Sequence, residues 1–104
     1  MIMNIYCYYN KLLEAFGNYQ LDDHEPAKVV AGLTRDLRAQ WLQKDVSNLK
    51  PIDLYVLGQF NDETGEFTND KHLLMSLGDL IAQFEAQKVK DLAANESKQE
   101  SVGA

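Results

Sequence analysis

The segment LYVLGQFNDETGE, from Leu54 to Glu66, joins an alternating run of side chains to a turn that ends in glycine. Side chains of a strand point alternately to its two faces, so we expect Leu54 and Val56 on one face and Tyr55 on the other. In the turn at residues 61–65, Asn and Asp side chains can bond nearby backbone N–H groups, and glycine tolerates positive φ. The segment therefore predicts a strand, a hairpin turn and a short returning strand over residues 66–68.

The same turn carries carboxylates that a hard cation could bind. Asp62, Glu63 and Glu66 fall close together. A calcium loop of the EF-hand type spreads its oxygen ligands over about twelve residues and closes with a bidentate glutamate. Because that spacing is absent, we expect a solvated hairpin turn and no metal site.

A longer segment, KPIDLYVLGQFNDETG from Lys50 to Gly65, resembles the signature of the small non-structural protein of gokushoviruses, the single-stranded DNA phages of the Microviridae. The opening IYCYYNK, Ile5 to Lys11, is similar to the start of that family, and Ala27 to Arg35 matches a family helix that carries an alanine and then an arginine. Asn10 and Asn61 stand where the family usually has aspartate. The resemblance implies a viral protein that is absent from the mature capsid and assists single-stranded genome synthesis, binding or packaging.

The composition is that of an ordinary soluble globular protein. The chain has 104 residues, of which 45% are apolar and 25% charged, as expected for one domain with one core. No apolar run approaches the roughly 18 residues of a membrane span, and the first residues lack the basic start of a secretory signal. We therefore expect a protein of the host cytoplasm without membrane contact, with a domain over residues 1–90 and a disordered tail over residues 91–104.

Residue types that carry catalysis or bind metals are few. Cys7 is the single cysteine, and in a strand rich in aromatics we expect it to be a buried small hydrophobe. His24 follows Asp22 and Asp23, but neither His24 nor His72 belongs to an i, i+4 ligand pair. No glycine-rich phosphate loop and no nucleophile with an adjacent base is recognisable. We expect no enzyme activity and no cofactor.

Charge is distributed unevenly along the chain. The formal net charge is −6, which argues against simple attraction to phosphate, because nucleic-acid affinity comes largely from cations that displace counterions. Residues 27–50 nevertheless contain five basic and two acidic residues. The basic character is therefore concentrated in one segment.

Strands and helices follow from the periodicity. Residues 2–9 predict a strand, Asn10-Lys11 a turn, and residues 12–21 a returning strand with a bulge near Gly17. An acidic cluster before Pro26 predicts a helix to about Leu42, with an apolar stripe at Val30, Leu33, Leu37 and Trp41. Thr68-Asn69-Asp70 predicts the N-cap of a second helix, whose apolar face would be Leu73, Leu77, Leu80, Ile81 and Phe84.

Together these elements predict an α+β fold. We expect a small antiparallel sheet of three or four strands, in the order strand, strand, helix, strand, optional strand, helix, with both amphipathic helices on one face. The other face would carry Tyr6, Tyr8, Tyr55 and Leu57. An exposed aromatic patch needs a binding partner or a second copy to explain it.

Two functions fit these features. A protein that binds single-stranded DNA would stack bases on Tyr6, Tyr8 and Tyr55 and contact phosphates with Lys28, Arg35 and Arg38 on the back of the first helix; its affinity would fall steeply with salt. Alternatively, a homodimer could bury the tyrosines and engage phage replication, capsid-assembly or host proteins without touching DNA.

Overall fold

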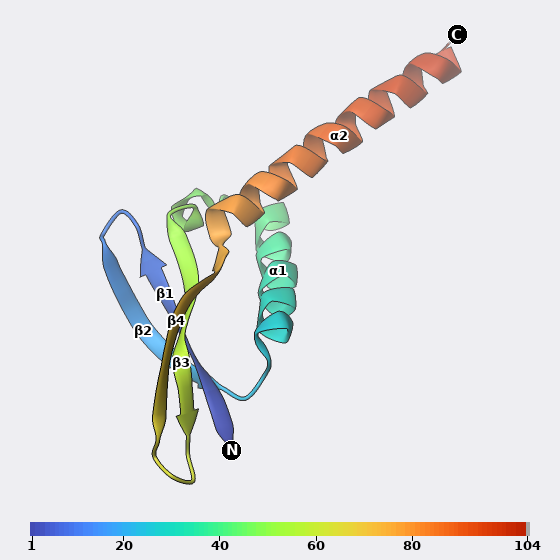
Figure 1. The fold of residues 1–104 in the computed structure, drawn as a ribbon. Helices are drawn as coiled ribbons and strands as arrows, with labels where there is room; N and C mark the ends of the chain where they lie inside the picture. The colour runs from blue at the N-terminus through green and yellow to red at the C-terminus, as the bar shows by residue number, and fades with distance from the viewer. Residues whose placement is uncertain (104) are drawn as a thin grey trace.

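The computed structural model describes the backbone of residues 1–103 and the side chains of residues 1–94. Strands β1 (Ile2–Asn10), β2 (Ala15–Asp22), β3 (Ile52–Asn61) and β4 (Phe67–Ser76) form one sheet in the order β2-β1-β3-β4. All neighbouring strands pair antiparallel. Helix α1 (Pro26–Gln43) and the short 3₁₀ turn η1 (Ser47–Leu49) connect β2 to β3, and α2 (Leu77–Gly103) follows β4. The predicted α+β class and element order are confirmed (Figure 1).

The core lies between the sheet and the helices. One cluster contains the buried Leu54, Val56 and Tyr6, which pack against Val29 and Leu33 of α1. A second cluster joins the two helices and the segment around η1 through Leu37, Val46, Leu77, Leu80 and Ile81. Leu33, Leu37 and Trp41 of the predicted α1 stripe pack in these clusters, but Val29 takes the place predicted for Val30. On α2 the predicted Leu77, Leu80, Ile81 and Phe84 pack in the second cluster, because burying one apolar stripe is what stabilises a surface helix.

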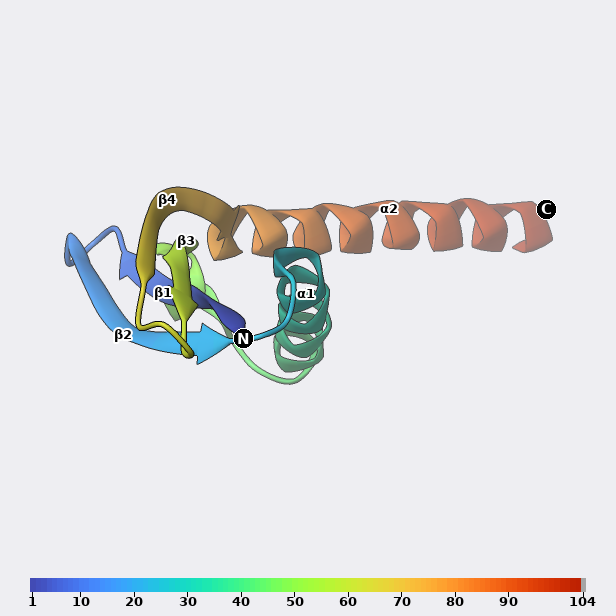
Figure 2. The same cartoon turned by 60° about the horizontal axis from the view of Figure 1, so that its bottom comes forward.

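The sheet is strongly curved, and its edge strands approach each other over the face that carries no helix (Figure 2). In a flat sheet of four strands the two edges would lie about 14 Å apart. Here Lys71 of edge strand β4 places its ammonium nitrogen 5.0 Å from the ring centroid of Phe16 on the opposite edge strand β2. We call this curved face of the sheet, which carries no helix, the trough (Figure 2).

The second helix begins later than predicted. Thr68, Asn69 and Asp70 do not cap a helix, because β4 continues to Ser76 and pairs Thr68 with Gln59 of β3. The cap is Ser76, whose hydroxyl accepts a hydrogen bond from the Asp79 backbone N–H at 3.3 Å, as expected at a helix start. Leu73 is therefore a strand residue and not the first member of the helix stripe.

The first hairpin turn is wider than the predicted Asn10-Lys11 pair. Asn10 accepts backbone N–H bonds from Leu12 and Leu13 at 2.9 and 3.1 Å, and Glu14 takes a positive φ of 52°. The predicted turn at residues 61–65 is confirmed. Its Asn61 accepts an N–H bond from Glu63 at 3.0 Å, and Gly65 has φ of 74°.

Helix α2 extends well past the sheet and gives the molecule an elongated outline of 71 × 30 × 21 Å (Figure 1). The sequence predicts disorder over residues 91–104, whereas the structure continues α2 to Gly103. The side chains after Ala94, and Ala104 altogether, lie outside the described residues. Within the part of the chain that is described, no helix has the length and apolar character that a membrane crossing would require.

Candidate nucleic-acid interface

Three aromatic rings meet on the sheet face that carries no helix. Tyr9 of β1 and Phe16 of β2 have ring centroids 4.8 Å apart, and Tyr55 of β3 lies 5.4 Å from Phe16 and 6.1 Å from Tyr9 in edge-to-face contacts. Such tilted and T-shaped contacts are the favoured geometries of aromatic pairs. We call these three residues the ring cluster.

Strand pairing explains why the ring cluster forms. Tyr9 lies directly opposite Phe16, and Cys7 lies directly opposite Tyr55. Residues directly opposite each other in an antiparallel pair point to the same face, and Cys7 and Tyr9 share a face because they are two positions apart. Curvature of the sheet then brings Phe16 past β1 into contact with Tyr55.

Lys71 lies over the ring cluster from the other edge of the trough. Its ammonium nitrogen is 5.0 Å from the Phe16 centroid and 5.8 Å from the Tyr55 centroid, within the range of a cation–π contact. Among residues 1–94, whose side chains the structure describes, no carboxylate forms an ion pair with Lys71. Its remaining N–H donors can therefore reach an anion.

Another pair of charges on this face is already neutralised. Asp53 lies opposite Tyr9 and is buried at 7% exposure. The ammonium of Lys11 is 3.4 Å from its carboxylate. Lys71 is therefore the cation of this face that has no carboxylate partner among the described side chains.

Exposed apolar side chains surround the ring cluster. The strand partners of Ile5, Cys7 and Tyr55 on this face are Leu21, Tyr19 and Leu73. Their exposed fractions are 43%, 67% and 51%, and that of Phe16 is 41%. The face therefore offers aromatic and aliphatic surface to a partner, with Tyr19 the most accessible ring.

Cys7 lies beneath this surface, and its thiol is buried and unreactive. It is 3% exposed, and its thiol donates a hydrogen bond to the Gly17 carbonyl at 3.3 Å. Burial raises the pKa of the Cys7 thiol, so the unreactive protonated form is favoured. The predicted burial of this cysteine is confirmed.

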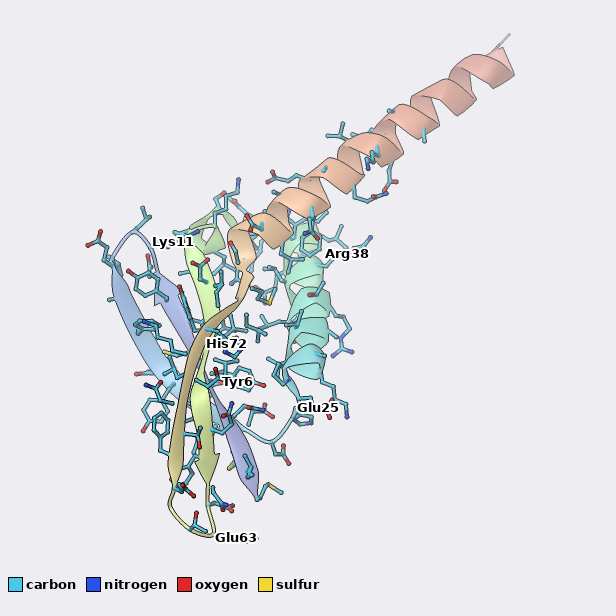
Figure 3. The ribbon with its side chains drawn as sticks, viewed as in Figure 1. Tyr6, Lys11, Glu25, Arg38, Glu63 and His72 are labelled. Carbon is cyan, nitrogen blue, oxygen red and sulfur yellow. The ribbon has the colours of Figure 1, made fainter. Side chains whose placement is uncertain are left out.

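Of the three tyrosines predicted for the uncovered face, only Tyr55 lies there. Tyr6 faces α1, is 6% exposed, and donates its hydroxyl to the His24 carbonyl at 3.1 Å (Figure 3). Tyr8, at 38% exposure, lines a shallow cavity on that same side with Leu54 and Val29. The prediction for Tyr6 and Tyr8 was wrong because these residues pair with Val56 and Leu54, whose side chains point to the helices.

Burial has a second consequence for Tyr6. It raises the pKa of the phenol, and the nearby charge of Asp22 raises it further. The buried hydroxyl therefore stays protonated and fixes the start of the β2–α1 connection, and it is inaccessible to a nucleic-acid base.

The predicted cations of α1 are exposed but lie away from the ring cluster. Lys28, Arg35 and Arg38 are exposed residues of α1, and α1 lies on the side of the sheet opposite the trough, where Figure 3 labels Arg38. Arg35 has an exposed neighbour, Asp36, with 3.8 Å between guanidinium and carboxylate. The structure therefore does not combine these basic residues with the tyrosines in one site.

The acidic residues before α1 converge on His24. Its ring nitrogen Nδ1 is 2.6 Å from an Asp22 carboxylate oxygen and 3.4 Å from one of Asp23. The His24 backbone N–H also donates to Asp22 at 2.7 Å. These contacts form a compact turn into Pro26, and the group is largely open to solvent.

The Asp22 contacts predict a dependence of stability on pH. Hydrogen bonds from the backbone and then the side chain of His24 lower the pKa of Asp22 below its ordinary value. A lowered pKa in the folded state stabilises the fold above the unfolded pKa, and this contribution is lost as pH falls through the folded pKa. We expect Asp22→Ala to destabilise the protein at pH 7 but to have little effect near pH 2, as measured by urea unfolding. Asp23→Ala is the matched control, and a pH-independent effect of Asp22→Ala would contradict the assignment.

Searches of protein-family models, curated proteins and solved structures return no match to this chain.

Proposed function

We propose that this protein is a non-enzymatic phage protein that binds single-stranded DNA in the trough of its sheet and so assists genome replication or packaging. The observation that carries the proposal is the ring cluster with Lys71 above it and Tyr19 beside it. Sheet faces that bind single strands combine aromatic stacking platforms with nearby cations. The resemblance to the gokushovirus family, described above, supports the biological setting.

The geometry favours stacking at the accessible rings rather than between them. Centroid distances of 4.8 to 6.1 Å leave no room for a base inside the ring cluster. Phe16 and Tyr19 are the more exposed rings, so bases would stack on these two while Tyr9 and Tyr55 hold Phe16 in place. Lys71, whose ammonium lies over Phe16 in the free protein, would leave that ring to the base and contact a phosphate of the same strand.

The trough is expected to prefer single strands to duplex DNA. Bases of a duplex are already stacked and paired, so their flat faces are not available to protein rings. The curved sheet, with Lys71 and Phe16 approaching from opposite edges, further restricts a rigid duplex. An extended single strand can follow the trough.

This site predicts that DNA affinity depends only weakly on salt concentration. A site formed by Lys28, Arg35 and Arg38 of α1 would instead give a steep dependence. For a single strand, one phosphate contact by Lys71 gives a slope of log K against log salt of about −0.7, and Lys71→Ala should remove most of that dependence. The measurement is fluorescence anisotropy of a labelled oligonucleotide at several salt concentrations, with a duplex of the same sequence as control. Saturable binding that prefers the single strand supports the proposal, and no binding even at low salt contradicts it.

A double variant with Arg35→Ala and Arg38→Ala tests whether DNA binds to α1, on the helix side of the sheet. Its DNA affinity is compared with that of Lys71→Ala. If this double variant abolishes binding while Lys71→Ala does not, the DNA site is the back of α1 and not the trough.

A second candidate function is a protein-interaction module without DNA contact. The observation that favours it is the aliphatic surface of the same face, where Leu21 and Leu73 are 43% and 51% exposed. Phage replication or capsid-assembly proteins are the candidate partners. Failure to bind any oligonucleotide, together with co-purification of such a partner that is lost in Leu73→Asp, would favour this function.

A further inference from the structure

A groove runs between the C-terminal half of α1 and the first half of α2, on the opposite side of the sheet from the trough. Its volume is about 700 Å³, and its lining includes Arg38, Trp41, Leu42, Phe84, Lys88 and Asp91. The Trp41 and Phe84 rings lie 5.6 Å apart, and the Lys88 ammonium is 5.9 Å from the Trp41 ring. We call it the helix groove.

Apolar side chains remain exposed in and beside the helix groove. Leu42 at its edge is 69% exposed, although it belongs to the same helix as the buried Leu37. Farther along α2, Val89 and Leu92 are 66% and 53% exposed. This part of α2 extends beyond both the sheet and α1 (Figures 1 and 2). A helix without tertiary packing is only marginally stable in water. Packing against a partner would therefore stabilise this segment of α2.

The charges that line the groove indicate which kind of partner binds there. Its lining contains two cations, Arg38 and Lys88, and two carboxylates, Glu85 and Asp91, whereas the whole chain carries −6. A DNA strand would meet two carboxylates here. A second copy of the same surface would meet an equal mixture of both signs, which suits a two-fold interface in which each patch contacts its own copy.

We infer that two copies of this chain associate through the helix groove, with the segment of α2 that carries Val89 and Leu92 packed in the groove of the partner. Leu42 and Leu92 then become buried in the interface, and the exposed part of α2 acquires a packing partner. The two troughs stay uncovered, because each lies on the far side of its own sheet. This inference does not depend on DNA binding.

Sedimentation velocity from about 5 to 200 µM protein tests this inference, since a functional dimer of micromolar Kd would be largely formed over that range. We expect a species of twice the 11.8 kDa chain mass. Leu42→Asp and Leu92→Asp should each raise the dimer Kd at least about tenfold, because a charge replaces an apolar side chain in a desolvated contact. Both positions are exposed in the single chain, so circular dichroism should show unchanged folding.

Leu12→Asp is the matched control, since Leu12 is 80% exposed in the β1–β2 turn and is not among the residues that line the groove. It should leave the dimer intact. A wild type that stays monomeric at the highest concentration overturns the inference. So does a dimer that survives both groove variants, and a dimer lost in Leu73→Asp but not in Leu92→Asp would move the interface to the trough.

Discussion

Replacing Gly58 with alanine is expected to lower the free energy of unfolding by about 3 kcal/mol, among the larger effects of single substitutions. Gly58 lies in β3 with φ of 156°, and an added Cβ would come within 2.1 Å of the Thr68 carbonyl oxygen in β4. Because that atom belongs to the backbone, relief requires the strands to separate. Urea unfolding monitored by circular dichroism measures the change.

Gly58 also lies at an irregularity of the sheet. The register between β3 and β4 shifts between Val56 and Gly58, and a bulge of this kind increases local twist. We therefore expect the alanine variant to disturb the curvature of the trough as well as its stability.

Gly65→Ala is the control for this substitution. Gly65 also has positive φ, at 74°, but no atom lies within 4 Å of an added Cβ, so the cost should be only about 1 kcal/mol of backbone strain. If Gly58→Ala unfolds within about 0.5 kcal/mol of the wild type, which is the range of neutral surface changes, the close approach of the two strands is not maintained in solution.

Replacing Phe16 or Tyr19 with alanine is expected to weaken single-stranded DNA binding by about 5-fold to 150-fold each, since one base stack is worth roughly 1–3 kcal/mol. Both rings are accessible on the trough face, at 41% and 67% exposure. Loss of Phe16 also removes the ring under Lys71, so its effect should be the larger. Fluorescence anisotropy with a labelled oligonucleotide measures both.

Tyr8→Ala is the matched control for the ring variants. Tyr8 is as exposed as Phe16, at 38%, but it lies on the helix side of the sheet. Its replacement should leave DNA affinity unchanged. Equal losses in Tyr8→Ala and Phe16→Ala would mean that the trough is not the binding surface.

Alternation and turn chemistry were sufficient to predict much of the fold. The burial of Leu54 and Val56, the turn at residues 61–65 and the packing of Leu33, Leu37 and Trp41 of α1 all follow from local rules. These features depend on neighbours in the chain, which sequence patterns describe well.

The sequence could not fix which face of β1 the helices cover. Its two faces, with Ile5, Cys7 and Tyr9 on one and Tyr6 and Tyr8 on the other, are both apolar. The choice is made by pairing with β3, which places Tyr6 beside Val56. A shift of one position in the face assignment moves every side chain of a strand to the other side.

The boundary between β4 and α2 was ambiguous for a similar reason. Leu73, Leu77, Leu80 and Ile81 fit a helical stripe, yet pairing with β3 extends the strand to Ser76. The predicted site missed Lys71 and Phe16 because their contact crosses the sheet from edge to edge. No local pattern reports the curvature that brings them together.

NMR titration of the ¹⁵N-labelled protein with a short oligothymidine shows whether DNA binds in the trough, as we propose. We expect the backbone amide signals of Tyr9, Phe16, Tyr19 and Lys71 to shift in proportion to DNA added, while those of Lys28, Arg35 and Arg38 stay in place. Shifts confined to α1, or no shifts in the trough at saturating DNA, would contradict DNA binding in the trough.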